Sequence, residues 1–329
     1  MPFIRRSSQP AKRTTVAKAG ELSSVEQAVA RAYAEAVRQF REGINTPRVA
    51  DAIRQSINAT LQALPTGSII GDLRPIVDAL VKEIIKAGRA EAGATSVGFK
   101  LRFNEADPRA TQWAMERAGQ LVKGVSDEIE ELISDVVTQA VDGKISIREA
   151  QRRLQRTVGL HPRWQQAVNN THARLLKQYL ASGYGESQAQ DLAQVAAQKY
   201  QDRLVRARAK NIARTEIATA QNEGRWVAWQ QADDVGLVKL NDSMKEWRTA
   251  PEFVSSKTVV CPICAPLDGK RIPVSENFQT GLRAHPDGIK MPPAHPSCRC
   301  RAVLVTKSFA EIEAEVLEAR RQEAQGRQR

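Results

Sequence analysis

The feature that most constrains the fold of this 329-residue chain is a cluster of thiols. All four cysteines fall between Cys261 and Cys300, and none occurs in the first 260 residues. Cys261 and Cys264 form a C-x-x-C pair, a spacing that lets two thiolates reach one tetrahedral metal ion. The segment "HPSCRC" supplies His295, Cys298 and Cys300 as candidates for the other half of the site. Five candidate ligands therefore compete for the four positions of a zinc ion.

Two other states of the cysteines are compatible with the same pattern, namely two disulfides or four buried reduced thiols. The segment 261–300 is poor in apolar residues and contains the polar loop "SENFQTGLRAHPDG", so it buries too little surface to order itself without a cross-link. We therefore expect a structural zinc site made of Cys261, Cys264, Cys298 and either His295 or Cys300. Four protein ligands leave no open coordination position for catalysis.

The rest of the chain carries a helical pattern. Apolar residues recur at helical spacing through most of the chain before residue 232, as in Val25, Val29 and Phe40. Beyond that point the short segments "GLVKL", "KEWRTA" and "CRAVLV" have strand-like composition and are separated by Pro, Gly, Asp and Ser. The sequence thus predicts a mainly α fold with a small C-terminal α+β domain: a long helical N-terminal region followed by a short-stranded, Cys-clustered domain.

Local signals predict where several helices begin. Ser23 or Ser24 is placed to cap the first helix, and Thr46 precedes Pro47 as the N-cap of the second. The apolar pattern of that second helix continues through Leu61. The segment "SIRE", residues 146–149, matches a capping box, in which the serine and glutamate side chains each bond the other's backbone N–H.

Four segments follow from these patterns. Residues 1–20 carry Ser, Pro, Arg and Lys without apolar periodicity and are expected to form a flexible basic arm. Residues 21–204 form the helical region, and residues 205–306 the Cys/His-clustered domain. Residues 307–329 are expected to form a C-terminal helix, capped by Ser308, and a basic tail.

The formal charge of +12 and the pI near 9.8 favour a polyanionic partner, because basic side chains near phosphates release counterions. A basic but merely solvated helical surface explains the same composition. No stretch approaches the ~20 apolar residues of a membrane span, and no secretory signal is present, so we expect no membrane anchor. A chain made and kept in a cytoplasm has reduced thiols, which bind metals more often than they form disulfides.

The helix around "NIARTEIATAQNEGRW" carries Arg214, Glu216 and Asn222 among apolar residues. These side chains invite a catalytic interpretation, but no nucleophile or base partner can be assigned to them. We expect them to make intrahelical or interhelical polar contacts that hold the small domain on its helix. Asp268 and Gly269 lie in a predicted turn, where Asp268 is expected to form the turn and not to act as an acid.

Other residues and motifs give no sign of an active site. The chain has none of the common phosphate-binding, metalloprotease or serine-hydrolase motifs, and it is not expected to be an enzyme. His161, His172 and His285 match no ligand spacing and are expected at the surface or at helix caps.

Four motifs occur in an order that resembles the phage head morphogenesis family, the Mu F-like minor head proteins of tailed bacteriophages. They are "ARTEIATAQNEGRW", "KEWRTA", "CPICAPLDGKRIPV" and "MPPAHPSCRCRAVLV", and the resemblance covers about residues 205–305. The resemblance marks these positions as motif residues of the domain: Arg214, Glu216, Asn222, Trp247, Asp268 and Gly269.

The resemblance implies a non-enzymatic virion component, made in the host cytoplasm and located in the capsid interior or at the portal vertex. It further implies a role in head assembly, DNA packaging or DNA delivery, with the portal protein, other capsid proteins and packaged double-stranded DNA as partners. Two alternatives stay open from the residues alone. One is a zinc-containing nucleic-acid-binding protein, and the other is an injected effector with an unrecognised enzymatic activity.

Overall fold

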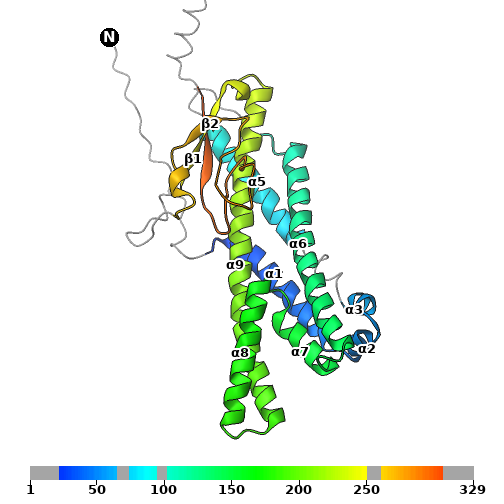
Figure 1. The fold of residues 1–329 in the computed structure, drawn as a ribbon. Coiled ribbons are helices and arrows are strands. Elements are labelled where there is room, and N and C mark those ends of the chain that lie inside the picture. Colours follow the sequence, from blue (N-terminus) through cyan, green and yellow to red (C-terminus); the bar gives the residue numbers. More distant parts are fainter. Residues whose placement is uncertain (1–21, 65–73, 95–101, 250–260, 307–329) are drawn as a thin grey trace, which may run out of the picture.

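The structure, a computed structural model, describes residues 22–64, 74–94, 102–249 and 261–306, and within them the chain is mostly helical (Figure 1). The helices are α1 Ser24–Ile44, α2 Pro47–Gln55, α3 Ile57–Ala63, α5 Arg74–Ala94, α6 Pro108–Val141, α7 Ile147–Thr157, α8 Pro162–Ala181 and α9 Glu186–Asp234. The strands are β1 Met244–Arg248, β2 Arg271–Pro273 and β3 Arg301–Val305. The predicted fold class, mainly α with a small C-terminal α+β part, is confirmed.

Two of the predicted helix starts differ in how completely the capping box forms. Ser23 forms a full capping box at α1, because its hydroxyl accepts the Glu26 N–H and its own N–H is donated to the Glu26 carboxylate at 2.7 Å. The box predicted at Ser146 is only half formed. Its hydroxyl accepts the Glu149 N–H at 3.1 Å, but the Glu149 carboxylate accepts from Arg156 at 2.6 Å instead.

The second predicted helix is interrupted. Thr46 caps α2 as expected, but Ser56 adopts an extended backbone with φ −174° and ψ 170°. Ser56 then caps α3, since its hydroxyl accepts the Ala59 N–H at 3.0 Å. Serine competes for backbone hydrogen bonds in this way, which ends one helix and starts another where apolar periodicity alone predicts a single helix.

Helix α9 joins the two parts of the molecule. Its first turns pair with α8 in a helical hairpin that projects from one end of the molecule in Figure 1, and its middle packs against α1 and α5. At Gly224 the crossing with α5 is so close that an added Cβ would lie 2.2 Å from the Ile84 carbonyl oxygen. The boundary predicted between residues 204 and 205 falls inside this continuous helix.

The described part of the helical region has two main apolar cores, and a small third cluster forms where Phe103 packs on α5 and α9. The largest core contains side chains of α1, α2, α6, α7, α8 and α9, including the fully buried Phe40, Ile133 and Leu154. The second lies where α5 meets α1, α6 and α9 and contains Leu80 and Ile217. Among the described helices, none combines the length and the hydropathy that a membrane crossing needs.

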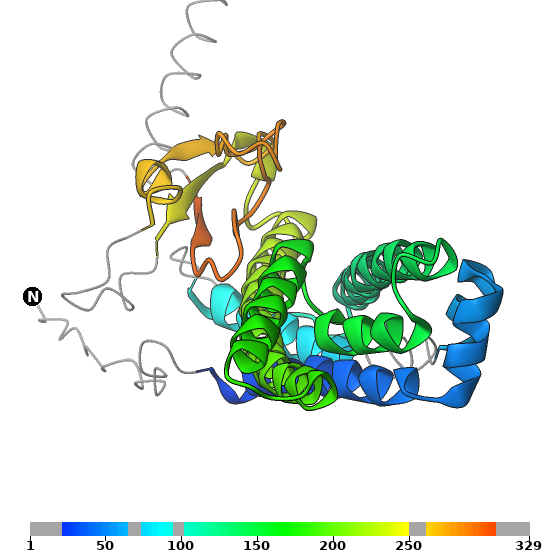
Figure 2. The ribbon, with the colours of Figure 1, turned by 60° about the horizontal axis from the view of Figure 1, so that its bottom comes forward.

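The small domain is a three-stranded antiparallel sheet in the order β2-β1-β3, with Met244 opposite both Pro273 and Val305. In Figure 2 it stands beside α9, on the opposite side of the molecule from α2 and α3. The strands predicted in "KEWRTA" and "CRAVLV" are confirmed as β1 and β3.

The strand predicted in "GLVKL" is wrong. Gly236 has a positive φ of 73°, and Leu240 opens a short 3-10 turn. Val238 and Leu240 pack against Trp229 of α9, so this apolar segment serves the interface between helix and sheet and not a fourth strand. The predicted arm at residues 1–20 and the predicted C-terminal helix beyond Ser308 lie outside the described residues.

Candidate metal centre

Three of the predicted ligands lie close together in the small domain. Two are on the C-x-x-C loop, and the third, His295, is on the "HPSC" loop. His295 Nε2 lies 3.0 Å from Cys261 Sγ and 3.1 Å from Cys264 Sγ. The three donor atoms lie within 4.8 Å of one another. The C-x-x-C segment is a tight turn, because the Cys264 N–H donates to the Cys261 carbonyl oxygen at 3.0 Å and approaches its sulfur at 3.4 Å. The turn therefore aims both thiols at one imidazole.

A second triad shares Cys264 with the first. The sulfurs of Cys264, Cys298 and Cys300 also lie within 4.8 Å of one another, and all three residues are buried. Cys264 Sγ and Cys298 Sγ are 3.8 Å apart. Two thiolates on one tetrahedral zinc, each at about 2.3 Å, lie roughly 3.8 Å from each other. The structure thus brings all five predicted ligands together, with Cys264 at the centre.

The donor chemistry suits a metal ion. All four cysteines are free thiols in the structure, not disulfides. A hydrogen bond from Cys264, helped by Cys300, lowers the pKa of the Cys298 thiol, and the same contact with Cys298 raises the pKa of Cys264. The cluster therefore favours at least one thiolate, the form of cysteine that binds metals. It could hold a metal ion.

His295 is oriented as metal-binding histidines are. Its Nδ1 lies 3.0 Å from the Pro296 carbonyl oxygen. A proton held on Nδ1 by that carbonyl leaves Nε2 with a free lone pair, which points at the two thiols of the C-x-x-C turn.

The "HPSC" loop is held on α9 by polar side chains. Ser297, whose φ is +60°, donates its N–H to Thr215 Oγ1 at 2.9 Å and its hydroxyl to Asn211 Oδ1 at 3.0 Å. Eleven residues after Asn211, the buried Asn222 donates to the Cys300 carbonyl oxygen and accepts the Ala302 N–H, both at 3.1 Å. The predicted role of Asn222, holding the small domain on its helix, is confirmed.

Sequence reasoning missed Asn211 and Thr215. The signal was present, because Asn211, Thr215 and Asn222 have spacings of four and seven residues and so lie on one face of a helix. A polar stripe on an otherwise apolar helix marks a surface that bonds to backbone. Here that backbone belongs to the loop carrying three of the five candidate ligands.

Glu216 and Arg214 lie on the same helix as Asn222 and have different neighbours. Glu216, which is buried, accepts two hydrogen bonds from Arg117 of α6, at 2.7 and 2.9 Å. That contact is interhelical, as expected, but it joins α9 to α6 and does not hold the small domain. Arg214 lies near Arg299 of the loop, and burial, then the positive charge of Arg299, lowers the pKa of Arg214.

The remaining motif residues build the small domain itself. Trp247 is fully buried, with its ring edge-on to Phe278 at 5.2 Å between centroids. Gly269, at φ +74°, donates its N–H to the Trp247 carbonyl oxygen at 2.8 Å. Asp268 Oδ1 accepts from both the N–H and the hydroxyl of Thr249, at 2.8 and 2.9 Å. The Lys270 N–H donates to the Leu267 carbonyl oxygen at 2.9 Å, so Asp268 lies in a turn, as predicted.

Two of the isolated histidines are placed clearly. His161 caps α8, where its Nδ1 accepts the Arg163 N–H at 3.4 Å. His172 is buried near Arg156, and burial, then the charge of Arg156, lowers its pKa. The expectation of a surface or capping position is confirmed for His161 and wrong for His172.

Comparison with known proteins gives one match. The family model described as "Phage Mu protein F like protein" matches residues 131–303, which contain α7, α8, α9, the sheet and all five candidate ligands. No curated protein and no solved structure matches.

Proposed function

The chain belongs to the Phage Mu protein F like family of phage head morphogenesis proteins, and from this premise we propose that it is a minor head protein of a tailed phage, bound at the portal vertex. The observation that supports this role is the extent of the match, which spans the small domain and the helices that hold it. In this proposal the protein acts in head assembly and in the packaging or delivery of DNA.

The motif residues of the family support a scaffolding role and not a catalytic one. Asn222 bonds β3 to α9, Trp247 fills the core of the small domain, and the Asp268 carboxylate accepts from Thr249. Each of these side chains is occupied by a contact that maintains the fold. A rigid small domain fixed on a long helix is a suitable platform for binding other head proteins.

Zinc is the metal that the cluster suits best, because three thiols with one imidazole are typical ligands of structural zinc sites. We assign Cys261, Cys264, Cys298 and His295 as its ligands. The contact between His295 Nδ1 and the Pro296 carbonyl oxygen orients the imidazole. His295 Nε2 lies beside the sulfurs of Cys261 and Cys264, and the sulfur of Cys264 lies beside that of Cys298. The metal would supply a cross-link between the two loops and contribute folding free energy.

Packaged DNA is proposed as a second partner. The full sequence carries an excess of twelve positive charges, which matches a polyanion.

Co-assembly with the portal protein tests the proposed role. The full chain and the portal protein encoded beside it are produced together, with the major capsid protein present or absent, and the portal is purified by an affinity tag. The chain is expected to co-purify with the portal and to be found in few copies in finished heads. Heads that assemble fully around the portal and contain none of this chain would contradict the proposal.

A further inference from the structure

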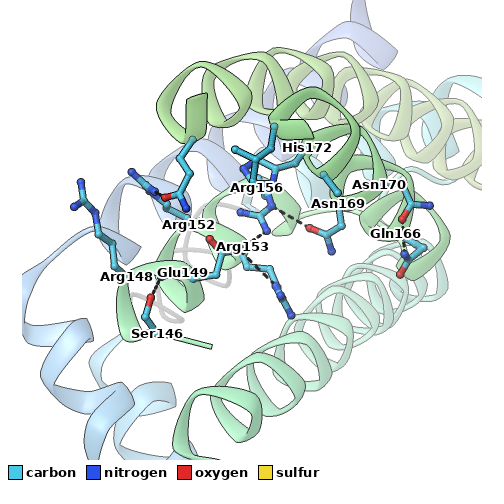
Figure 3. Close-up of a pocket in the computed structure, with 13 residues that line it drawn as sticks. Ser146, Arg148, Glu149, Arg152, Arg153, Arg156, Gln166, Asn169, Asn170 and His172 are labelled. Carbon is cyan, nitrogen blue, oxygen red and sulfur yellow. Dashed lines mark hydrogen bonds and ion pairs between the residues drawn. The ribbon is translucent and has the colours of Figure 1, made fainter. Parts of the chain in front are cut away.

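A polar pocket of about 540 Å³ lies between α7, α8 and the beginning of α9, far along the chain from the cysteine cluster (Figure 3). Of its lining residues four are arginines, Arg148, Arg152, Arg153 and Arg156, and only Glu149 is acidic. Arg148, Arg152 and Arg156 are four residues apart, so the turns of α7 stack them on one face of the helix. The pocket therefore has an excess of positive charge.

One of these arginines is buried at the base of the pocket. Arg156 is 3% exposed and donates to Glu149 at 2.6 Å, to Asn169 at 3.0 Å and to Gln194 at 3.2 Å. Burial is the main cause that lowers its pKa, and repulsion from Arg153 and Arg152 adds to the effect. A guanidinium held in place inside a cluster of like charges stabilises the fold little, so a bound anion would relieve a repulsion that is already present.

Other donors at the pocket have capacity left. Among the residues that the structure describes, Arg148 has no hydrogen-bond or ion-pair partner, and it is exposed at the rim. Within the same described part, the buried Nε of Arg153 has no acceptor, and its nearest carboxylate oxygen, on Glu149, is 3.9 Å away. The amide side chains of Asn169 and Asn170 line the opposite wall on α8.

We propose that this pocket binds a phosphate group, presented either by a nucleic-acid backbone or by a free phosphate compound. Guanidinium groups match phosphate oxygens in pairs, and a phosphate has enough oxygens and charge to occupy several arginines at once. A single carboxylate, with two oxygens and one charge, would leave most of these donors unused. No phenylalanine, tyrosine or tryptophan is among the lining residues described, and the one imidazole, that of His172, is buried, so the pocket offers no exposed aromatic ring on which a base would stack.

The inference concerns the helical region and does not rest on a role in head assembly. Arg148→Gln is the test variant, because Arg148 has no contact that the fold needs. Arg206→Gln is the matched control, since it removes the same single charge from an exposed position on α9 outside the pocket. Pyrophosphate is titrated into the full-length wild type and both variants, and binding is measured by calorimetry and by the shift in unfolding temperature.

Pyrophosphate is expected to bind the wild type and Arg206→Gln equally, and Arg148→Gln about tenfold more weakly. NMR of His172 supplies a second readout, because an anion bound beside Arg156 raises the pKa of His172. No binding to the wild type, or equal weakening in the two variants, overturns the proposal. So does binding of poly-glutamate that depends on Arg148 in the absence of phosphate binding.

The source of the phosphate is decided with duplex DNA of mixed sequence. If the backbone occupies the pocket, Arg148→Gln lowers the salt dependence of DNA binding by about one counterion, Arg206→Gln does not, and pyrophosphate competes with the DNA. If the slope is unchanged while pyrophosphate binding is lost, the ligand is a free phosphate compound. Both outcomes support a phosphate site.

Discussion

The helical region and the small domain are held together by different forces. In the helical region, apolar side chains from six of the described helices form a continuous core that contains Phe40, Ile133 and Leu154. The small domain has a much smaller buried cluster, and Cys264, Cys298 and Cys300 are among its members. Its contacts with α9 combine a small apolar seam with hydrogen bonds from Asn211, Thr215 and Asn222.

The difference shows how a long helix can carry a domain that has little core of its own. A domain with few apolar residues needs cross-links or a support to fold. The cysteine cluster and the polar stripe of α9 supply these two, one inside the domain and one beneath it. Removing either should affect the small domain much more than the helices.

The largest effect is expected for Cys264→Ser, because Cys264 belongs to both triads. We expect the variant to lose bound zinc and to destabilise the small domain by more than about 3 kcal/mol, while the helices stay folded. Metal analysis, near-UV circular dichroism of Trp247 and far-UV circular dichroism measure the three quantities. If the small domain and the helices of the variant unfold in a single transition, the two regions form one cooperative unit. That result would contradict the difference drawn between them.

The choice of the fourth ligand sharpens the same experiment. His295→Ala is expected to lower the zinc affinity by at least about 100-fold, and Cys300→Ser to change it by less than about tenfold. The reverse order would assign Cys300 as the ligand. If His295→Ala, Cys300→Ser and Cys264→Ser all bind zinc as tightly as the wild type does, the cluster is not a metal site.

Gly224→Ala tests the close packing of α9 on α5 within the helical region. The added methyl group would lie 2.2 Å from the Ile84 carbonyl oxygen, so α5 and α9 must move apart. We expect a loss of about 2–3 kcal/mol, measured by denaturant unfolding monitored at 222 nm. Gly119→Ala on α6 is the control, because an added Cβ there meets nothing within 4 Å and alanine favours the helix.

Asn222→Ala removes the side chain that bonds both sides of the Cys300–Ala302 backbone. Two buried backbone groups lose their partner, and we expect a loss of about 2 kcal/mol in the stability of the small domain. Gln188→Ala, at an exposed position on the same helix, is the control and is expected to change stability by less than about 0.5 kcal/mol. If amide exchange, compared with the wild type, accelerates more in β3 than in α5, the loss of stability lies in the small domain.

The smallest effect concerns pH. Burial raises the pKa of Glu223 on α9 from 4.5 to about 7, against the opposing charge of Lys290. The folded state therefore binds a proton more tightly than the unfolded chain, and stability falls as pH rises from about 4.5 to about 7. Glu223→Gln should remove this part of the pH dependence, with a gain of the order of 1 kcal/mol above pH 7. The free energy of unfolding is measured with urea at pH 5 and at pH 7.5. An equal change in this free energy between the two pH values for the wild type and Glu223→Gln would contradict the prediction.

The sequence predicted the elements better than their ends. Helical periodicity predicted helices through most of the chain before residue 232, and capping signals predicted the starts of α1 and α2. The break at Ser56 and the missing strand at "GLVKL" escaped it, because each depends on a competition that periodicity does not contain. At Ser56 a side chain competes for backbone hydrogen bonds, and at Val238 a contact with Trp229 replaces strand pairing.

For the candidate site too, the sequence predicted some features and missed others. Spacing alone brought Cys261, Cys264, His295, Cys298 and Cys300 into consideration, since ligands must lie close along the chain or at the ends of a closed loop. From the sequence, Glu216 was expected to hold the small domain on its helix. In the fold it pairs with Arg117, ninety-nine residues away. Such partners come from packing of distant helices.

By itself the sequence determined the fold class, the family and the set of candidate metal ligands, because periodicity and motif spacing are local properties of the chain. Only the tertiary structure decided that Cys264 lies at the centre of the cluster, that α9 supports the loop through Asn211, Thr215 and Asn222, and that four arginines of α7 surround one pocket with His172. Those arrangements require segments far apart in the chain to meet, and burial of side chains between the packed helices determines where they do.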